Sequence, residues 1–231
     1  MKDIFGKALV DFLLGTNDKD IITSTSISEN DTLPLSYLFR DYNDMPIIEK
    51  KALDLSYGRI LDVGCGAGSH SLYLKSLGYN VKAIDVSEGA IIVTKHRGVM
   101  NAQKLDVLDV MVQYDTILIL MNGTGIFQTI KSTPKYLTHL KSLLSPGGQI
   151  LIDSSDIKYM YKGQEKHYLV ENSDKYYGEL DYYLSYRGVK EIPMKWLYLD
   201  FLKLKTLSNS VGLTCKLMFR GPHHDYLAKL S

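Results

Sequence analysis

Short apolar runs alternate along this chain with segments in which apolar residues recur at helical spacing. The runs are typical of strands buried on both faces of a parallel sheet, and they fall at residues 60–63, 81–84, 117–121 and 150–152. Helices are expected between them, over 69–77, 87–98 and 133–144. Ser87 is well placed to cap the second of these helices, and Thr133 followed by Pro134 to begin the third. The alternation predicts an α/β domain.

The two ends of the chain follow different patterns. In the first part, helices are expected over 4–13, through 38–42 and through 47–53. A polar, Ser/Thr-rich stretch from Thr16 to Thr32 is expected to be irregular. At the other end, Asp200 is expected to cap a helix that runs to Val211, and two strands follow over 213–219 and 226–230.

The most informative segment is the turn after the first core strand. It reads Ile60-Leu61-Asp62-Val63-Gly64-Cys65-Gly66-Ala67-Gly68, an apolar run that ends in an acid and continues with glycines at alternate positions. Glycine tolerates positive φ and lets a ligand approach the backbone without meeting a Cβ. The helix that follows presents unpaired N–H groups to a carboxylate or phosphate. This order predicts a nucleotide or nucleoside site, whereas an ordinary tight turn would account for only one or two glycines.

The spacing of the glycines favours one kind of nucleoside site. A dinucleotide site follows G-x-G-x-x-G, which would place the third glycine where this chain has Ser69. The series Asp62-x-Gly64-x-Gly66-x-Gly68 instead resembles the first motif of class I S-adenosylmethionine (SAM) dependent methyltransferases. Segments within residues 58–155 resemble later motifs of that family in the same order: Val81–Asp85, Lys104–Val107, Tyr114–Asn122 and Leu144–Ile152.

The resemblance implies a fold and a set of cofactor contacts. The fold is a Rossmann-like, seven-stranded, mostly parallel sheet with helices on both faces and an antiparallel last strand. Asp85 would accept hydrogen bonds from the ribose hydroxyls, Asp106 and the N–H of Val107 would hold the adenine, and Arg40 would meet the methionine carboxylate. The cofactor residues implied in this way are Asp62, Gly64, Cys65, Gly66, Gly68, Asp85, Val86, Asp106, Val107, Asn122 and Arg40.

Several of these residues also have a plain structural interpretation. Asp85 and Asp106 belong to a residue type that caps helices and forms turns, and Asn122 with the following glycine is a common turn pair. Arg40 could equally be a solvated surface residue. Cys65 is interpreted as a small filler of the loop rather than a nucleophile, because no basic residue adjoins it.

Aromatic residues are concentrated between the fifth core strand and the late helix. The only tryptophan and nine of the 17 tyrosines lie there, at positions 159, 161, 168, 176, 177, 182, 183, 186 and 198. Residues 180–187 and 194–199 predict a hairpin, similar to the substrate-covering insert of small-molecule methyltransferases. Tyrosine combines an apolar wall with a polar tip, which suits a small amphipathic or cationic acceptor. Tyr183, Trp196 and Tyr198, with Asn122, are the expected acceptor contacts; packing of the hairpin or a dimer contact is the alternative.

The turn between the last two strands carries two adjacent histidines, His223 and His224. In a parallel sheet, ligands bind at the carboxyl ends of the strands, and the final hairpin of this fold would bring its turn to the same edge. The two histidines are therefore the candidates for removing a proton from the acceptor. The alternative is a solvated surface turn. His70, at the start of the first core helix, is expected to pack near the glycine loop.

Composition narrows the choice of partners. The 231 residues, 45% of them hydrophobic and 23% charged, suit one α/β domain, and a formal net charge of +1 gives no electrostatic case for nucleic-acid binding. The two cysteines, Cys65 and Cys215, indicate neither a disulfide framework nor a metal cluster. No apolar run approaches the length of a membrane span, and the N-terminus has no signal-peptide core. We expect a cytoplasmic protein without metal, membrane or nucleic-acid partners; a homodimer remains open.

Together these patterns predict one SAM-methyltransferase domain over 1–231. It would comprise a helical cap over 1–55, the cofactor core over 56–155, a substrate-side insert with the hairpin over 156–199, and a final helix with two strands over 200–231. The predicted activity (EC 2.1.1.-) is in-line transfer of a methyl group from SAM to a small molecule, which releases S-adenosylhomocysteine (SAH). Because a sulfonium methyl is already activated, alignment and exclusion of water are the protein's main tasks. The alternatives are a nicotinamide-dependent oxidoreductase and a non-catalytic SAM-binding module, since a fold alone does not establish activity.

Overall fold

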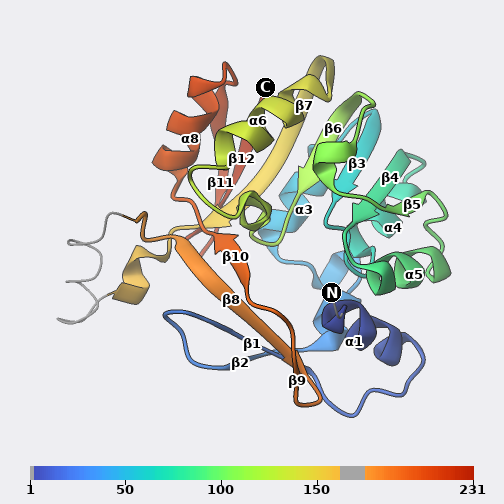
Figure 1. Ribbon diagram of the computed structural model, residues 1–231. Coiled ribbons are helices and arrows are strands. Elements are labelled where there is room, and N and C mark those ends of the chain that lie inside the picture. Colours follow the sequence, from blue (N-terminus) through green and yellow to red (C-terminus); the bar gives the residue numbers. More distant parts are fainter. Residues whose placement is uncertain (1–2, 162–174) are drawn as a thin grey trace.

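A computed structural model describes residues 3–161 and 175–231 of the chain. Its larger sheet has seven strands in the order β11-β12-β7-β6-β3-β4-β5 (Figure 1). They are β3 (Arg59–Val63), β4 (Asn80–Asp85), β5 (Ala102–Lys104), β6 (Tyr114–Ile119), β7 (Leu144–Ser155), β11 (Cys215–Arg220) and β12 (Asp225–Leu230). The strands from β5 to β7 run parallel, whereas β12 pairs antiparallel with both β7 and β11. The predicted Rossmann-like sheet with an antiparallel last strand is confirmed.

Helices cover both faces of this sheet, as predicted. One face carries α3 (Ile47–Asp54), α4 (Ser69–Ser76) and α5 (Glu88–His96), and the other carries α6 (Thr133–Ser142) and α8 (Phe201–Ser210). The side chains of Ser87 and Asp200 each accept a hydrogen bond from a backbone N–H in the first turn of α5 and α8, as their positions predicted. In α6 the cap position is Ser132 rather than Thr133, and Pro134 lies in the first turn.

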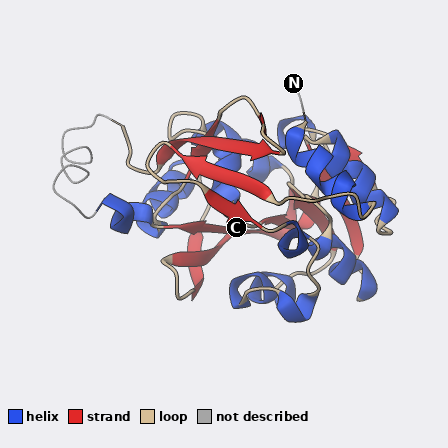
Figure 2. Cartoon of the chain, turned by 90° about the horizontal axis from the view of Figure 1, so that it is seen from below, coloured by secondary structure: helices blue, strands red, loops and turns tan. Residues whose placement is uncertain are grey.

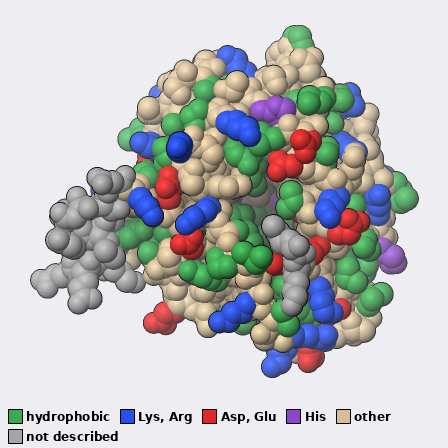
Figure 3. Space-filling model, viewed as in Figure 1, with side chains coloured by type: hydrophobic (Ala, Val, Ile, Leu, Met, Phe, Trp, Pro, Cys, Tyr) green, Lys and Arg blue, Asp and Glu red, His purple; other side chains and the backbone are tan. Residues whose placement is uncertain are grey.

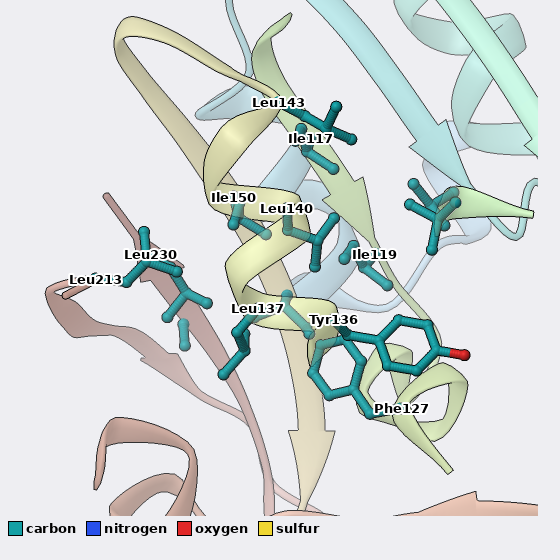
Figure 4. Packing of buried hydrophobic residues seen from close by; sticks show 14 of the residues in the cluster. Ile117, Ile119, Phe127, Tyr136, Leu137, Leu140, Leu143, Ile150, Leu213 and Leu230 are labelled. Atoms are coloured by element: carbon teal, nitrogen blue, oxygen red, sulfur yellow. The ribbon is translucent and has the colours of Figure 1, made fainter. Parts of the chain in front are cut away.

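Apolar side chains fill the space between α6 and the sheet (Figure 4). Leu137 and Leu140 of α6 pack in one cluster with Ile117 and Ile119 of β6 and Ile150 of β7, and all five are fully buried. Burial of a side chain of this size stabilises a fold by about 1.5–3 kcal/mol. Tightly packed apolar side chains therefore hold the parallel strands in place.

A second, smaller sheet has the strand order β10-β8-β1-β2, with β9 paired to β8. Its strands are β1 (Ile21–Thr25), β2 (Asp31–Leu33), β8 (Glu179–Tyr186), β9 (Val189–Lys190) and β10 (Met194–Leu197). The antiparallel pair β8–β10 is the predicted inserted hairpin, and β1 from the N-terminal arm extends it on the other side. In Figure 1 this sheet lies below the larger one, and Figure 2 views the molecule from that side.

The N-terminal arm differs from the sequence prediction in two places. Helices α1 (Ile4–Leu13) and α3 form as expected. The stretch from Thr16 to Thr32 is not irregular, because its β-branched residues form β1 and begin β2 once β8 supplies a pairing edge. The single helix expected through 38–42 is broken into α2 (Leu35–Leu38) and a 3₁₀ turn, η1 (Tyr42–Asp44). It ends early because the Arg40 guanidinium folds back and donates to the carbonyl of Tyr37.

Among the residues that the structure describes, no helix has both the length and the apolar character needed to cross a membrane. Nor does this part of the chain bring three or more His, Cys, Asp or Glu side chains together in a group suited to a metal ion.

Candidate functional site

The candidate site lies at the edge of the larger sheet where β3, β4 and β6 end. Gly64 follows β3, Asp85 ends β4, and Asn122 lies in the turn after β6. The topology therefore brings together residues that the sequence places far apart. The face shown in Figure 3 is hollowed near its centre, between this edge and the elements of the arm and the smaller sheet.

The glycine loop has the conformation that its composition predicts. Gly64, Gly66 and Gly68 all have positive φ, of 72°, 53° and 82°. A Cβ added to Gly64 would meet nothing within 4 Å, so the backbone there faces open space. A Cβ at Gly68 would lie 2.9 Å from the side chain of Thr94, which explains why a larger residue does not fit at the start of α4. The Thr94 hydroxyl also donates to the carbonyl of Gly66, at 2.9 Å.

Asp85 ties the end of β4 to this loop. Its Oδ2 accepts from the backbone N–H of Gly66 at 2.9 Å, and its Oδ1 accepts from the N–H of Ser87 at 2.9 Å. Burial raises the pKa of this carboxyl, and the two backbone donors oppose the shift. Each oxygen keeps a second lone pair that a ligand hydroxyl could use. Asp62, one strand over, is 2% exposed and accepts from the Ser71 hydroxyl at 2.6 Å.

The residues expected around the adenine lie at the next strand end. Asp106 is exposed and caps the 3₁₀ turn η2 (Val107–Asp109), accepting from the N–H of Leu108 at 2.9 Å. Val107 is buried. Val86, directly after β4, is an apolar side chain that is 68% exposed, which is unusual for a residue at the carboxyl end of a core strand. The edge thus offers one acid and one uncovered apolar surface.

Arg40 is buried rather than solvated. Its guanidinium pairs with both carboxylate oxygens of Glu49 at 2.5 Å and lies over the ring of Tyr37, 3.9 Å from the centroid. Glu49 also contacts the imidazole of His70 at 2.7 Å, so the arm and α4 meet in one buried ionic cluster. Burial opposes ionisation of Glu49, but His70 and Arg40 outweigh it and lower the pKa of that carboxyl. Within the described residues, the buried Nε of Arg40 has no hydrogen-bond partner.

Helix α1 closes the site on the side of α5. The carboxylate of Asp3 accepts from the N–H of Gly6, in the first turn of α1, and from the N–H of Gly89, in the first turn of α5. It also accepts from the hydroxyl of Ser87, two residues beyond Asp85. One side chain therefore caps two helices and anchors the arm next to the end of β4.

The smaller sheet presents an aromatic face toward the larger one. Trp196 and Tyr182 lie on the same face, with ring centroids 5.3 Å apart. A Cβ on Gly125, in the 3₁₀ turn η3 (Gly123–Phe127), would fall 2.0 Å from the Trp196 indole, so the ring lies directly on that backbone. Among the described residues, the buried Nε1 of Trp196 has no hydrogen-bond partner.

The structure separates the expected acceptor contacts into two groups. Trp196 lies on the backbone of η3, whereas Tyr198 packs against a small apolar cluster that includes Leu180, and burial raises the pKa of the Tyr198 hydroxyl. Tyr183 lies on the opposite face of β8 from Tyr182, because successive strand residues point to opposite sides, and it is 41% exposed. Tyr183 is therefore not brought together with the others. Tyr168, part of the same aromatic concentration, lies outside the described residues.

The two histidines lie at the expected edge of the sheet. The turn between β11 and β12 ends at Asp225, which pairs with Ser155 at the carboxyl end of β7. Both histidines are exposed, and the ring of His224 stacks on Tyr159 with 4.5 Å between centroids. The backbone N–H of His223 donates to Asp225 at 3.0 Å.

Two acids at this site were not singled out by the sequence patterns. Asp3 could have been found, because it directly precedes the apolar helical pattern of residues 4–13, where a cap is expected. Asp153 lies in the apolar run of β7, is 6% exposed, and accepts from the N–H groups of Met121 and Gly123. An acid inside a buried strand was its only signal.

The comparisons with known proteins agree with this geometry. A family model described as a methyltransferase domain matches residues 8–185. A SAM-dependent methyltransferase from Bacteroides fragilis, crystallised with SAH, is 37% identical to this chain, with a TM-score of 0.91 and a match that covers 100% of this chain and 94% of that one.

Curated relatives match over a shorter region. The ubiquinone biosynthesis O-methyltransferase of Dechloromonas aromatica is 28% identical over 113 residues, 45% of this chain and 47% of that protein. The probable SAM-dependent methyltransferase TehB of Haemophilus influenzae is 29% identical over 128 residues, 50% of this chain and 43% of that protein. The chain spans about half the length of the curated relatives it matches.

The sheet order and the glycine loop define a nucleoside-binding α/β protein of the Rossmann-like kind. The chain belongs to the class I SAM-dependent methyltransferases (EC 2.1.1.-), a family whose cofactor is SAM. Membership of this family sets aside the nicotinamide-dependent alternative, in agreement with the glycine spacing.

Proposed function

We propose that this protein transfers the methyl group of SAM to a small molecule held between the carboxyl edge of the larger sheet and the aromatic face of the smaller one. The observation that carries the proposal is the position of the smaller sheet, whose Trp196 lies on the backbone of Gly125 directly beyond the Asn122 turn. Because the smaller sheet lies in direct contact with the turn that follows β6, it covers this edge of the larger sheet, and the covered space suits a small acceptor better than a macromolecule. The O-methyltransferase names of the curated relatives support the same class of acceptor.

The cofactor contacts proposed from the sequence fit the observed geometry. The open backbone at Gly64, with Cys65, Gly66 and Gly68, would receive the nucleoside, and Asp62 would hold helix α4 behind the loop through its bond to Ser71. Asp85 would accept from the ribose hydroxyls through its free lone pairs. Val86 would cover the adenine, with Asp106 and the N–H of Val107 at its edge.

Arg40 would hold the methionine carboxylate of the cofactor. Its Nε is buried and unpartnered among the described residues, and Glu49 fixes the guanidinium from the other side. The pairing with Glu49 already neutralises much of its charge, so a hydrogen bond from Nε is the specific contribution we assign to it. Asn122 would lie between the cofactor and the acceptor.

The chain's contribution to the reaction is alignment. SAM supplies an activated methyl group, so the residues around it need to hold the acceptor in line with the sulfur and exclude water. Trp196 and Tyr198 would form the apolar wall for the acceptor. His223 or His224 would take a proton where the acceptor carries one at working pH. Tyr183, on the outer face, is the weakest member of the proposed acceptor set.

The acceptor can be identified directly. Purified protein is incubated with methyl-labelled SAM and a fractionated small-molecule extract, and labelled products are identified by mass spectrometry. A single labelled small molecule is expected, formed with SAH in equal amount. Label that appears only in protein or nucleic acid contradicts a small acceptor. Tight SAM binding without any labelled product across the fractions favours a non-catalytic binding module instead.

A further inference from the structure

The turn after β6 contains two consecutive residues with positive φ, Met121 at 67° and Asn122 at 58°. Side chains rarely adopt this region, and an unbranched apolar residue such as methionine gains no local hydrogen bond from it. Such strain persists only where the surrounding structure enforces it, and it is concentrated at functional sites. In the register between β3 and β6, Asp62 lies opposite Leu118, which places this turn beside the glycine loop.

Strand β7 holds the turn from below. The Oδ2 of Asp153 accepts from the N–H of Met121 at 3.2 Å, and its Oδ1 accepts from the N–H of Gly123 at 2.9 Å. Two residues further on, the hydroxyl of Ser155 donates to the Oδ1 of Asn122 at 2.8 Å. The turn is thus fixed at its backbone on both sides of Asn122 and at the Asn122 side chain.

An ionised carboxylate is destabilising at this buried position. Burial raises the pKa of Asp153 to about 6, and Glu49 on α3 adds to the shift while His70 on α4 opposes it. The charge of this carboxylate in turn helps to raise the pKa of the Tyr37 and Tyr226 hydroxyls. Because the pKa is raised on folding, the contribution of Asp153 to stability is present at low pH and is lost as pH rises through about 6. At neutral pH the ionised group therefore weakens the fold.

Only the ionised form presents a strong acceptor to both backbone donors of the turn. A protonated carboxyl keeps one strong acceptor and offers a weaker hydroxyl oxygen at the other position, and the amide of an asparagine places an N–H donor there. A residue that costs stability yet matches two donors at the site edge is expected where the shape of the site depends on it.

We propose that Asp153 is a positioning residue, whose ionised carboxylate holds the strained turn at 121–123 in the shape that the cofactor site requires. The turn reaches that site through Met121, which packs in the same cluster as Phe5 of α1 and Ala67 of the glycine loop. Relaxation of the turn would therefore shift the apolar side of the cofactor site, while the core beneath it stays packed.

The test uses SAH as the probe, with affinity measured by calorimetry from pH 5 to 8. For Asp153→Asn we expect an affinity about tenfold lower at pH 7.5, because one donor of the turn loses its acceptor. The melting temperature at that pH should not fall in parallel, since the variant removes a buried charge. The wild-type protein should lose SAH affinity as pH falls through about 6, and this step should be absent from the variant.

Asp115→Asn is the matched control, because Asp115 also accepts from a backbone N–H, that of Arg59 at 2.7 Å, but at the opposite end of β6. Its SAH affinity should stay at the wild-type value. The proposal is overturned if Asp153→Asn binds SAH as tightly as the wild type, or if both proteins lose affinity together on acidification. If the variant does not fold, the wild-type pH profile decides alone, and a flat profile contradicts the proposal.

Discussion

The two sheets of this protein are built on different principles. In the larger sheet, each strand, turn and helix are neighbours in the sequence, and the expected ligand residue lies at the end of its own strand, as Asp85 does on β4. In the smaller sheet, β8 and β10 form a local hairpin, but β1 joins them from the distant N-terminal arm. From this comparison we expect the larger sheet to determine the affinity for the cofactor and the smaller sheet to determine the fit of the acceptor.

The largest effect is expected where the arm meets the larger sheet. Glu49→Ala would leave the buried Arg40 guanidinium and His70 without their carboxylate, which costs about 3–5 kcal/mol of the free energy of unfolding. Urea denaturation at neutral pH measures this loss in the free energy of unfolding. Glu88→Ala is the control, because its exposed pair with Lys104 should contribute about 0–1 kcal/mol. Equal losses in the two variants would mean that the buried cluster does not hold the arm in place.

Next in size is the effect of Asp85 on the cofactor. Asp85→Ala removes the proposed ribose contacts as well as the bonds to Gly66 and Ser87, so we expect SAH affinity to fall roughly tenfold or more. Calorimetry measures the change, and Asp109→Ala, at an exposed position near Asp106, serves as the control with unchanged affinity. An unaltered affinity in Asp85→Ala would remove this residue from the cofactor site.

Substitutions in the smaller sheet should affect binding of the acceptor and not binding of the cofactor. Once the acceptor is known, Trp196→Ala is expected to raise its KM about tenfold, since the indole wall is lost, and to leave SAH affinity unchanged. Tyr183→Ala, on the outer face of β8, should raise the KM of the acceptor much less than Trp196→Ala and leave SAH affinity unchanged. Steady-state kinetics with each variant would show which face of the smaller sheet contacts the acceptor. A larger effect of Tyr183→Ala than of Trp196→Ala would mean that the acceptor lies on the outer face.

The smallest effect is expected at Cys65. Burial raises the pKa of its thiol, with Asp62 and Asp85 adding to the shift, so the thiol stays protonated and unreactive. In the folded protein at pH 8, iodoacetamide should leave Cys65 unmodified by mass spectrometry, whereas urea should expose it. Rapid alkylation without urea would show that the glycine loop opens in solution.

The sequence predicted the larger sheet well because its signals are local. The apolar runs, the caps Ser87 and Asp200 and the three loop glycines each act within a few residues, and the structure places them as expected. The resemblance implied a cofactor contact for Arg40, but the pairing of Arg40 with Glu49 depends on how the arm folds back and has no local signature.

The smaller sheet was predicted only in part, for the same reason. The β8–β10 hairpin has a local turn, whereas β1 is a polar Thr/Ser segment that becomes a strand only beside β8. Tyr182 and Tyr183 are chemically alike, and only the register decides which of them faces inward. The role of Asp153 depends on contacts between two strands and was equally invisible in the sequence.

The pairing of β1 with β8 has a consequence for the order of assembly on the ribosome. Ile22 is synthesised early, but its partner Ser185 follows only after the parallel strands β3 to β7 have been translated. Contacts so distant along the chain form slowly, because a long loop must close before they are made. The parallel strands that carry the nucleoside site can therefore pair before β8 is available, whereas β11 and β12 join the larger sheet only after the smaller one has been translated.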